Sequence, residues 1–228
     1  MINDAHKPVV IAIDGPAGAG KSTVAKEVAR RLGFVYLDTG AMYRSLTLKA
    51  LRYHVDLQDE QKLTTLVLHT TIDLKMDHQH QLKVFLDGLD VTEEIRTPEV
   101  TNSTFHIAAV AAVREIMVER QRAIGKKTNV VAEGRDIGTV VFPQAYRKFY
   151  LDADFEERAK RRYKEMESKG AIIEAESVQK DLQERDTKDL TRKAGPLKKA
   201  EDAIVIDSTY MSIQDVVQTL IDRIESHA

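Results

Sequence analysis

The segment Gly15–Ser22 reads GPAGAGKS and satisfies the pattern G-x-x-x-x-G-K-[ST] in full. It stands between an apolar run and a helical pattern, the context in which such a loop binds phosphate. Its glycines allow the backbone N–H groups to converge on phosphate oxygens, and the following helix adds its positive dipole end. We expect Lys21 to reach the β- and γ-phosphates of ATP and the Ser22 hydroxyl to hold Mg²⁺. The pattern predicts a nucleoside triphosphate site but does not name an acceptor.

An acceptor site needs further positive charge. Phosphoryl transfer requires an acceptor phosphate held in line with the γ-phosphoryl group, and it requires that water be excluded. Open α/β sheets bind ligands at the carboxyl ends of their strands, so arginines that follow strands are candidates. Three segments qualify: LDTGAMYR at 37–44, EGRDIGT at 133–139 and RDTKDLTR at 185–192.

The first two segments each have a functional and a structural interpretation. Thr39 can donate a hydroxyl hydrogen bond and Arg44 can hold a phosphate bidentately, although a helix cap with a surface arginine explains them equally well. Arg135 is suited to phosphate, and the neighbouring Asp136 can act on a metal or a base. The alternative for this pair is a charged turn with a structural Arg–Asp contact. Its position after a strand favours function.

The third segment depends on its secondary structure. Arg185, Asp189 and Arg192 are spaced at i, i+4 and i+7, so they share one face if the stretch is helical. A solvated charged face is the commoner explanation for a single run of charges. The combination with the other two segments favours a binding role.

The elements that must position these residues alternate along the chain. Apolar runs predict strands at 9–13, 34–37, 130–132, 149–151 and 203–206, and helical patterns follow at 21–32 and 42–51. A final helix carries Ser212 and Asp215 at capping-box spacing, and one apolar face made of Ile213, Val216, Val217, Leu220 and Ile224. This alternation predicts a three-layer α/β/α fold with a mostly parallel sheet.

Two segments depart from the alternation. Residues 71–91 alternate apolar and polar side chains, which predicts a small antiparallel insert with one wetted face. Residues 155–199 are rich in charges.

Bulk composition narrows the class of protein. The 228 residues carry a net charge of −2 and no cysteine, which argues against nucleic-acid binding and excludes disulfides and thiolate metal sites. No stretch approaches the roughly 20 apolar residues of a membrane helix. The start MINDAHKPVV lacks the features of a secretory signal, so we expect a cytoplasmic protein that binds no membrane.

Seven stretches together resemble the bacterial cytidylate kinase family, from about Pro8 to the final helix. They are IDGPAGAGKST, YLDTGAMYR, VREIMVERQRA, EGRDIGTVVFP, LDADFEERAKRR, ERDTKDLTR and IDSTYMSI. The resemblance implies a P-loop kinase fold with a core at about 1–65, 100–153 and 200–228. It also implies an acceptor-binding insert at about 66–99 and a helical lid at about 154–199.

The same resemblance implies that the chain transfers the γ-phosphoryl group of Mg·ATP to CMP or dCMP. We take a monomer as the default, because the sequence shows no obvious interface. The implied ATP-binding residues are Gly15, Pro16, Ala17, Gly18, Ala19, Gly20, Lys21, Ser22 and Thr23, with Ser22 on the metal. The implied catalytic residues are Lys21, Arg135 and the lid arginines Arg158, Arg161 and Arg162 near the transferring phosphates. The implied CMP-binding residues are Thr39, Tyr43, Arg44, Arg114, Arg135, Asp136, Arg185, Asp189 and Arg192.

Within that set the resemblance assigns parts of the acceptor. Thr39 and Arg135 would contact its phosphate, and Arg185 and Asp189 would hold the sugar or share in reading the base. Arg114, Asp136 and Arg192 would read the base. Cytosine suits them, because its N4 amine can donate to a carboxylate while its N3 and O2 accept from an arginine. Uracil places an oxygen where the carboxylate needs a donor, and such a mismatch discriminates strongly.

The chain departs from the family pattern at two places. Glu133 stands where relatives often carry Asp, and Phe105 with His106 stands where a small hydroxyl residue and Gln are common. Two other functions remain open at this point. One is a kinase for another small acceptor such as UMP, AMP or shikimate, and the other is a nucleotide-binding regulator that transfers no phosphate.

Overall fold

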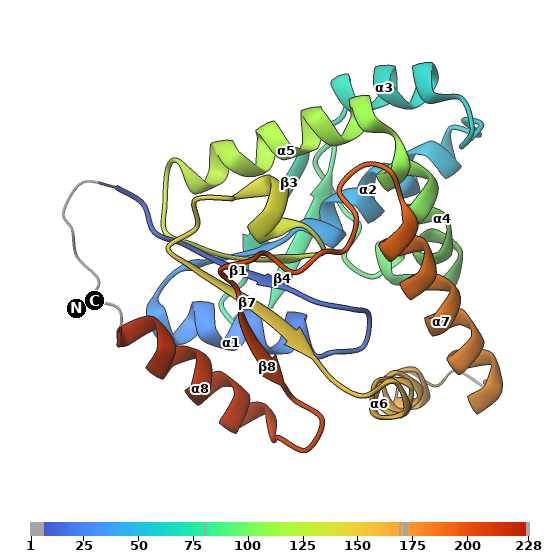
Figure 1. Ribbon diagram of the computed structural model, residues 1–228. Helices are drawn as coiled ribbons and strands as arrows, with labels where there is room; N and C mark the ends of the chain where they lie inside the picture. Colours follow the sequence, from blue (N-terminus) through green and yellow to red (C-terminus); the bar gives the residue numbers. More distant parts are fainter. Residues whose placement is uncertain (1–6, 80, 169, 171–172, 227–228) are drawn as a thin grey trace. The chain divides into compact units, whose positions relative to one another are not determined.

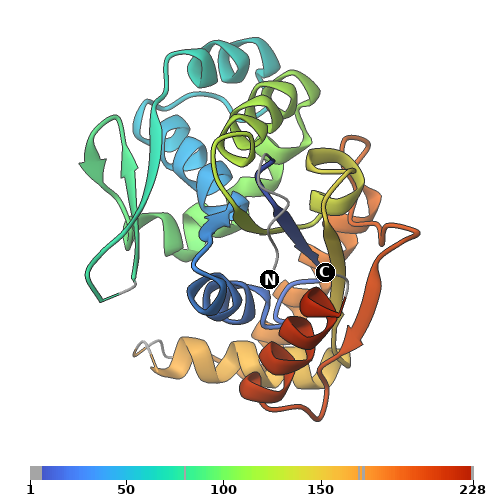
Figure 2. The same ribbon diagram turned by 90° about the vertical axis from the view of Figure 1, so that its left-hand side faces the viewer.

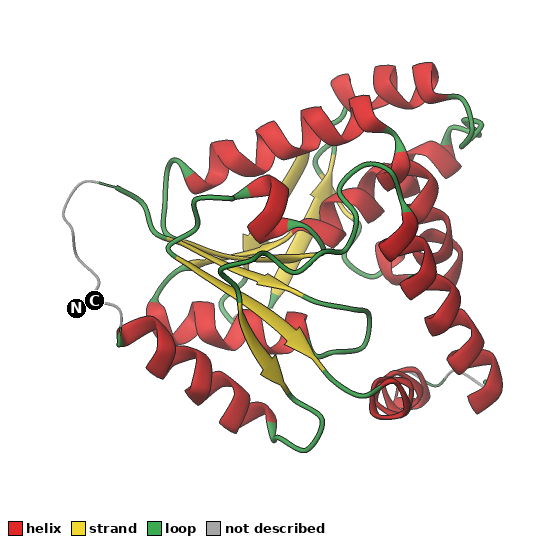
Figure 3. Cartoon of the chain, in the orientation of Figure 1, coloured by secondary structure: helices red, strands yellow, loops and turns green. Residues whose placement is uncertain are grey.

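The computed structural model describes residues 7–79, 81–168, 170 and 173–226. Its strands are drawn in yellow in Figure 3, and the main sheet has the strand order β2-β6-β1-β7-β8. The strands are β1 (Val10–Asp14), β2 (Val35–Asp38), β6 (Val130–Gly134), β7 (Arg147–Asp152) and β8 (Ile204–Asp207). β1 pairs in parallel with β6 and β7, and β7 pairs in parallel with β8. The α/β fold with a mostly parallel sheet is confirmed.

The central strands are apolar because they are buried on both faces. Ile11, Ala12 and Ile13 of β1 have no exposed surface, and the apolar residues of β6 and β7 beside them are equally buried. A strand between two parallel neighbours has no solvated face, so an unbroken apolar run is expected there.

Two helices lie together beside this sheet. α1 (Lys21–Leu32) packs against β6 and against α8 (Ile213–Glu225), as the blue and dark red helices in Figures 1 and 2 show. Gly33 ends α1 in a left-handed conformation, with φ of 67°, which suits glycine. Ser212 caps α8 by accepting the Asp215 N–H at 3.2 Å, as predicted.

One residue of the predicted apolar face is exposed. Ile213 is 50% exposed, whereas Val216, Val217, Leu220 and Ile224 are buried. Ile213 is the first residue of α8 and directly follows the cap Ser212, at the N-terminal end of the helix. Ile221 is buried in its place among the apolar positions.

The described chain forms two compact units. The first comprises residues up to Tyr36 and from Gly125 onward, and the second comprises Leu37–Ile124. Besides the strands and helices above, the first unit contains a π-helical turn, η2 (Ile137–Val141), and two charged helices, α6 (Phe155–Ser168) and α7 (Ala175–Thr191). α6 and α7 pack against each other.

The second unit is built around α2 (Thr39–Arg52), which packs against α4 (Pro98–Ala109). It also contains α3 (Glu60–Leu68), the 3₁₀ turn η1 (Glu94–Arg96) and α5 (Ala111–Gly125). Its sheet joins β3 (Ile72–Met76), β4 (Leu82–Leu86) and β5 (Leu89–Asp90) in antiparallel pairs, which confirms the predicted insert. Leu82, Val84 and Leu86 are buried while the residues between them are partly exposed, the alternation expected of a sheet with one solvated face.

Lys49 anchors this small sheet to α2. Its ammonium donates to the His69 carbonyl at 2.6 Å and pairs with Asp87 Oδ2 at 2.6 Å. Over the described part of the chain, the helices are all too short or too polar to cross a membrane.

Candidate active site

The loop Gly15–Ser22 joins the end of β1 to the start of α1, as the sequence predicted. Gly15, Gly18 and Gly20 have φ values of 151°, 76° and 87°, conformations that other residues rarely adopt. A Cβ on Gly15 would lie 2.0 Å from the Leu151 carbonyl oxygen, so the neighbouring strand also excludes a side chain there. The backbone path of the loop therefore depends on glycine for both conformation and space.

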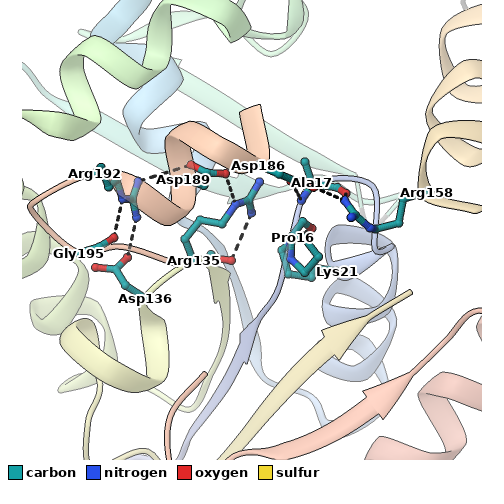
Figure 4. Close-up of polar contacts among 11 residues, drawn as sticks. Pro16, Ala17, Lys21, Arg135, Asp136, Arg158, Asp186, Asp189, Arg192 and Gly195 are labelled. Carbon is teal, nitrogen blue, oxygen red and sulfur yellow. Dashed lines mark hydrogen bonds and ion pairs between the residues drawn. The ribbon is translucent and has the colours of Figure 1, made fainter. Parts of the chain in front are cut away.

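Lys21 is buried under this loop. Its side chain is 5% exposed, and its Nζ donates to the Pro16 carbonyl at 2.6 Å (Figure 4). Burial, together with the positive charge of Arg135, lowers the pKa of Lys21 to about 7, while the charge of Glu133 opposes the shift. A bound polyphosphate would supply the negative charge that this amine needs to stay protonated.

Ser22 and Thr23 are exposed at the first turn of α1. The described residues contain no group of three or more His, Cys, Asp or Glu side chains arranged to hold a metal. Mg²⁺ commonly keeps several waters and takes phosphate oxygens with few protein ligands. A single hydroxyl at Ser22 therefore fits an ion that arrives with the nucleotide rather than one that resides in the protein.

Four charged side chains form a connected row beside the phosphate loop (Figure 4). Arg135 Nε donates to Asp189 Oδ2 at 2.6 Å, and Asp189 Oδ1 lies 3.8 Å from Arg192. Arg192 in turn lies 3.6 Å from Asp136 Oδ1. Burial opposes ionisation of Asp189, but the charges of Arg135 and Arg185 outweigh it and lower the pKa of this carboxyl. The row joins the loop after β6 to the end of α7.

The structure brings together residues that the sequence placed in two separate segments. Arg185 and Asp189 lie on α7, but this helix ends at Thr191, and Arg192 follows it with an extended ψ of 138°. The Arg192 guanidinium donates to the Gly195 carbonyl as well as facing Asp136. The third segment thus approaches the second by ion pairs rather than standing as a solvated helix face.

The three predicted catalytic arginines of α6 differ in what they contact. Arg158 donates to the Ala17 carbonyl of the phosphate loop at 3.0 Å and pairs with Asp186. Arg161 donates to the Ser208 carbonyl at 2.6 Å, in the segment after β8. Arg162 pairs with Glu165 at 2.8 Å on its own helix.

Two acidic residues at the loop were missed by sequence reasoning. Asp186 Oδ1 accepts the Ala17 N–H at 3.2 Å, so its carboxylate and Arg158 bond the two sides of one loop residue. Asp14, just before Gly15, accepts two backbone N–H groups from η2. The N–H groups that these two carboxylates accept lie more than a hundred residues away in the chain, and no local pattern marks such contacts.

The other predicted acceptor residues belong to the second unit. Asp38 caps α2 through the Ala41 N–H at 2.7 Å and pairs with Arg44 at 3.1 Å. The buried Arg114 lies over the Tyr43 ring, 5.5 Å from its centroid. Thr39 is the buried first residue of α2. The unit therefore carries Thr39 and Arg44 on α2 and Arg114 on α5.

The family departures also have defined surroundings. The Glu133 carboxylate accepts a hydrogen bond from the Tyr36 hydroxyl at 2.7 Å and is buried. The Phe105 and His106 rings lie edge to face with centroids 5.7 Å apart.

The family model and the curated relatives agree on one family. The family model described as cytidylate kinase matches residues 11–226. A cytidylate kinase from Desulforamulus reducens is 53% identical over 215 residues, covering 94% of this chain and 96% of that protein. A cytidylate kinase from Bacillus subtilis is 50% identical over 220 residues, covering 96% and 98%. Among solved structures, an uncharacterized protein from Eubacterium ventriosum covers 96% of this chain and 99% of its own, with a TM-score of 0.50 and 14% identity, a likeness of fold alone.

Proposed function

Because this chain belongs to the cytidylate kinase family, we propose that it transfers the γ-phosphoryl group of ATP to CMP and dCMP. The products are ADP and CDP or dCDP. The observation that carries the proposal is the row of Arg135, Asp189, Arg192 and Asp136 beside the buried Lys21. A phosphate loop alone serves many nucleotide-binding proteins, whereas a second set of arginines is needed when a second phosphate must be held.

The donor is held by the phosphate loop. The backbone N–H groups of the loop, which Pro16 alone in Gly15–Thr23 lacks, surround the phosphate oxygens, and Lys21 neutralises the β- and γ-phosphates. Arg158 covers the transferring group, which its contact with Ala17 supports. Arg161 and Arg162 approach the phosphates after changing partners, because each now bonds another group.

The acceptor phosphate is held by Thr39, Arg44 and Arg135, with Tyr43 beside them. Arg135 already bonds Asp189, which fixes the direction of its guanidinium before the acceptor arrives. Such preorganised positive charge lowers the barrier because it needs no rearrangement when charge moves in the transition state. Arg185 and Asp189 hold the sugar or share in reading the base.

Cytosine is read by Asp136 with Arg192 and Arg114. The Asp136 carboxylate accepts from the N4 amine, and the arginines donate to N3 and O2. The ion pair between Arg192 and Asp136, at 3.6 Å, supports this assignment, because it places a hydrogen-bond-accepting carboxylate beside a hydrogen-bond-donating guanidinium.

Transfer is direct and in line, without a covalent enzyme intermediate. The acceptor phosphate is largely ionised near neutral pH, so the chain need not supply a strong base. Mg²⁺, held through Ser22 and the ATP phosphates, would neutralise charge on the donor. Positioning and electrostatics therefore carry nearly all of the catalysis.

The proposal extends to organisation and location. Residues of about 66–99 act as the acceptor-binding insert, and those of about 154–199 act as the lid, around a core of about 1–65, 100–153 and 200–228. The enzyme works as a monomer in the cytoplasm, where ATP and nucleoside monophosphates are available, and it binds no nucleic acid and no membrane.

The test is ADP production from Mg·ATP with CMP, dCMP, UMP or AMP in parallel. We expect kcat/KM for CMP to exceed that for UMP by about 100-fold or more, because uracil leaves the carboxylate without a donor. Asp136→Asn should reduce the ratio of kcat/KM for CMP to kcat/KM for UMP by a larger factor than the factor by which it changes the KM for ATP. A preference for AMP would overturn the assignment of cytosine, and ADP release that CMP does not stimulate would favour a nucleotide-binding regulator.

A further inference from the structure

Asp14 ends β1 and directly precedes the phosphate loop. Its side chain is 3% exposed, and each carboxylate oxygen accepts one backbone N–H. Oδ1 accepts from Ile137 at 2.7 Å, and Oδ2 accepts from Gly138 at 2.7 Å. One buried side chain thus takes two successive amides from a segment 123 and 124 residues further along the chain.

These two bonds complete a bracket around Arg135 and Asp136. On the near side, the backbone of Asp14 is in register with Gly134 through the pairing of β1 with β6. On the far side, the carboxylate of Asp14 holds the N–H groups of Ile137 and Gly138. The two residues proposed to bind the acceptor therefore lie between two attachments to the same residue.

The bracket also requires close packing at Gly138. A Cβ there would lie 3.1 Å from Lys148 Cδ and 3.3 Å from Asp14 Oδ2, which is tighter than ordinary contacts between side chains. The absence of a side chain lets the Gly138 N–H reach the carboxylate. The glycine of this segment and the aspartate of β1 are matched to each other.

A buried carboxylate is a costly way to hold a loop. Burial raises the pKa of Asp14 to about 6, and the two backbone hydrogen bonds, from Gly138 and Ile137, oppose that shift. The charge of Asp136 contributes to the same rise, and the charge of Lys21 opposes it.

We propose that Asp14 is a positioning residue for the acceptor, which holds the Arg135–Asp136 segment at a set distance from the phosphate loop. The inference rests on the proposed function. Asp14 touches neither nucleotide in this role. It acts through the backbone of residues 137 and 138, so its loss should weaken the acceptor's binding more than the donor's.

The test is Asp14→Asn, which preserves shape but offers one accepting oxygen in place of two. The amide NH₂ then faces one of the two N–H groups, donor against donor, and the segment has to move. An unsatisfied buried group of this kind shifts the equilibrium between the original position of the segment and a displaced one by about 5- to 150-fold. We expect the KM for CMP to rise by about tenfold, while the KM for ATP changes less than about twofold.

The matched control is Asp152→Asn. Asp152 ends the neighbouring strand β7, and its Oδ1 accepts the N–H of the next residue, Ala153, at 2.9 Å. This carboxylate bond is local, and the contacts of Asp152 with the distant Ser208 use its backbone carbonyl, which the substitution keeps. The substitution should therefore leave both KM values near those of the unchanged chain. A KM for CMP that stays within twofold in Asp14→Asn, or a KM for ATP that rises as much, would overturn the inference.

Two further measurements separate the possible failures. If Asp14→Asn does not fold, Gly138→Ala takes its place, because the added Cβ pushes the N–H of residue 138 away from Asp14. The same rise in KM for CMP is expected, and an unchanged value counts against the inference. If the unchanged chain does not phosphorylate CMP, the proposed function fails by itself. The positioning is then read from the backbone amide resonances of Ile137 and Gly138, which must shift in Asp14→Asn if the bracket exists.

Discussion

At the level of single residues, charge is concentrated around one buried amine. Lys21 lies within the electrostatic reach of Arg135 and Arg185 on the positive side and of Glu133 and Asp189 on the negative side. Its burial and the nearby arginines disfavour the charged form, which is why its pKa falls to about 7. The negative charge of a bound triphosphate would therefore favour the protonated form of Lys21.

This arrangement predicts proton uptake when ATP binds. The triphosphate favours the charged amine, so the pKa of Lys21 rises on binding and the protein takes up a proton at pH values above about 7. We expect the number of protons taken up per site to be larger at pH 8 than at pH 6. Calorimetric titration with Mg·ATP in two buffers of different ionisation enthalpy measures this number.

The control for this prediction is Lys21→Met, which should take up close to no proton. It should also lower kcat by a factor of about 100 or more, as the loss of a transition-state charge contact does. Its Tm should not fall, because it removes a buried charge. Equal proton uptake by both proteins would show that another group titrates.

At the level of elements, α6 and α7 pack on the phosphate loop itself. Ala17 shares a small apolar cluster with Ala159, Leu182 and Phe155, and a Cβ on Gly18 would lie 3.0 Å from the Arg158 carbonyl oxygen. Asp186 and Arg158 add polar bonds to Ala17 at the same place. The base of the proposed lid is thus joined to the donor loop, so only parts of the lid further from Ala17 can move independently of it.

The glycines of the loop give a prediction at this scale. In Gly15→Ala the added Cβ meets the Leu151 carbonyl oxygen, so we expect a loss of about 3 kcal/mol or more and a Tm lower by about 6 °C or more. Gly33→Ala is the matched control, since Gly33 also has positive φ but nothing lies within 4 Å of its Cβ position. It should lose about 1 kcal/mol, from backbone strain alone. Thermal unfolding and kcat measure both variants, and similar losses would mean that conformation rather than space governs Gly15.

At the level of the whole molecule, the proposed acceptor residues belong to two compact units. Thr39, Tyr43, Arg44 and Arg114 lie in the second, and the remaining acceptor residues lie in the first. A nucleotide that binds the native chain and not the unfolded chain would stabilise the native state. Ligand-induced stabilisation therefore reports on the acceptor site without any turnover.

We expect CMP to raise the Tm of the free protein and UMP to raise it much less. A ligand at about 100 times its Kd adds about 2.7 kcal/mol, which corresponds to about 5–10 °C for a chain of this size. Thermal unfolding with each nucleotide monophosphate measures this rise, and Asp136→Asn is the control that should reduce the shift with CMP. A larger shift with AMP than with CMP would contradict the reading of the base.

Much of the fold followed from local pattern. The strand, loop and helix from Val10 to Leu32 lie within one residue of their predicted limits, because the apolar run, the glycines and the helical repeat are each short-range signals. The antiparallel insert followed from alternation in the same way. Ile213 shows the limit of the method, since periodicity gives the face of a helix but not where the covering surface ends.

Some features of the site, like those of the fold, followed from local sequence, and others depended on tertiary packing. Residue types and their spacing determined the phosphate loop, Lys21 and the three arginine-bearing segments, since short motifs dictate local backbone shape and charge. Only the tertiary structure decided that Arg135 bonds Asp189, that Arg158 rather than Arg161 contacts Ala17, and that Asp14 holds the segment after Asp136. These partners are 54 to 141 residues apart in the chain. Such pairings are set by the packing of the sheet and the helices, which a single sequence does not display.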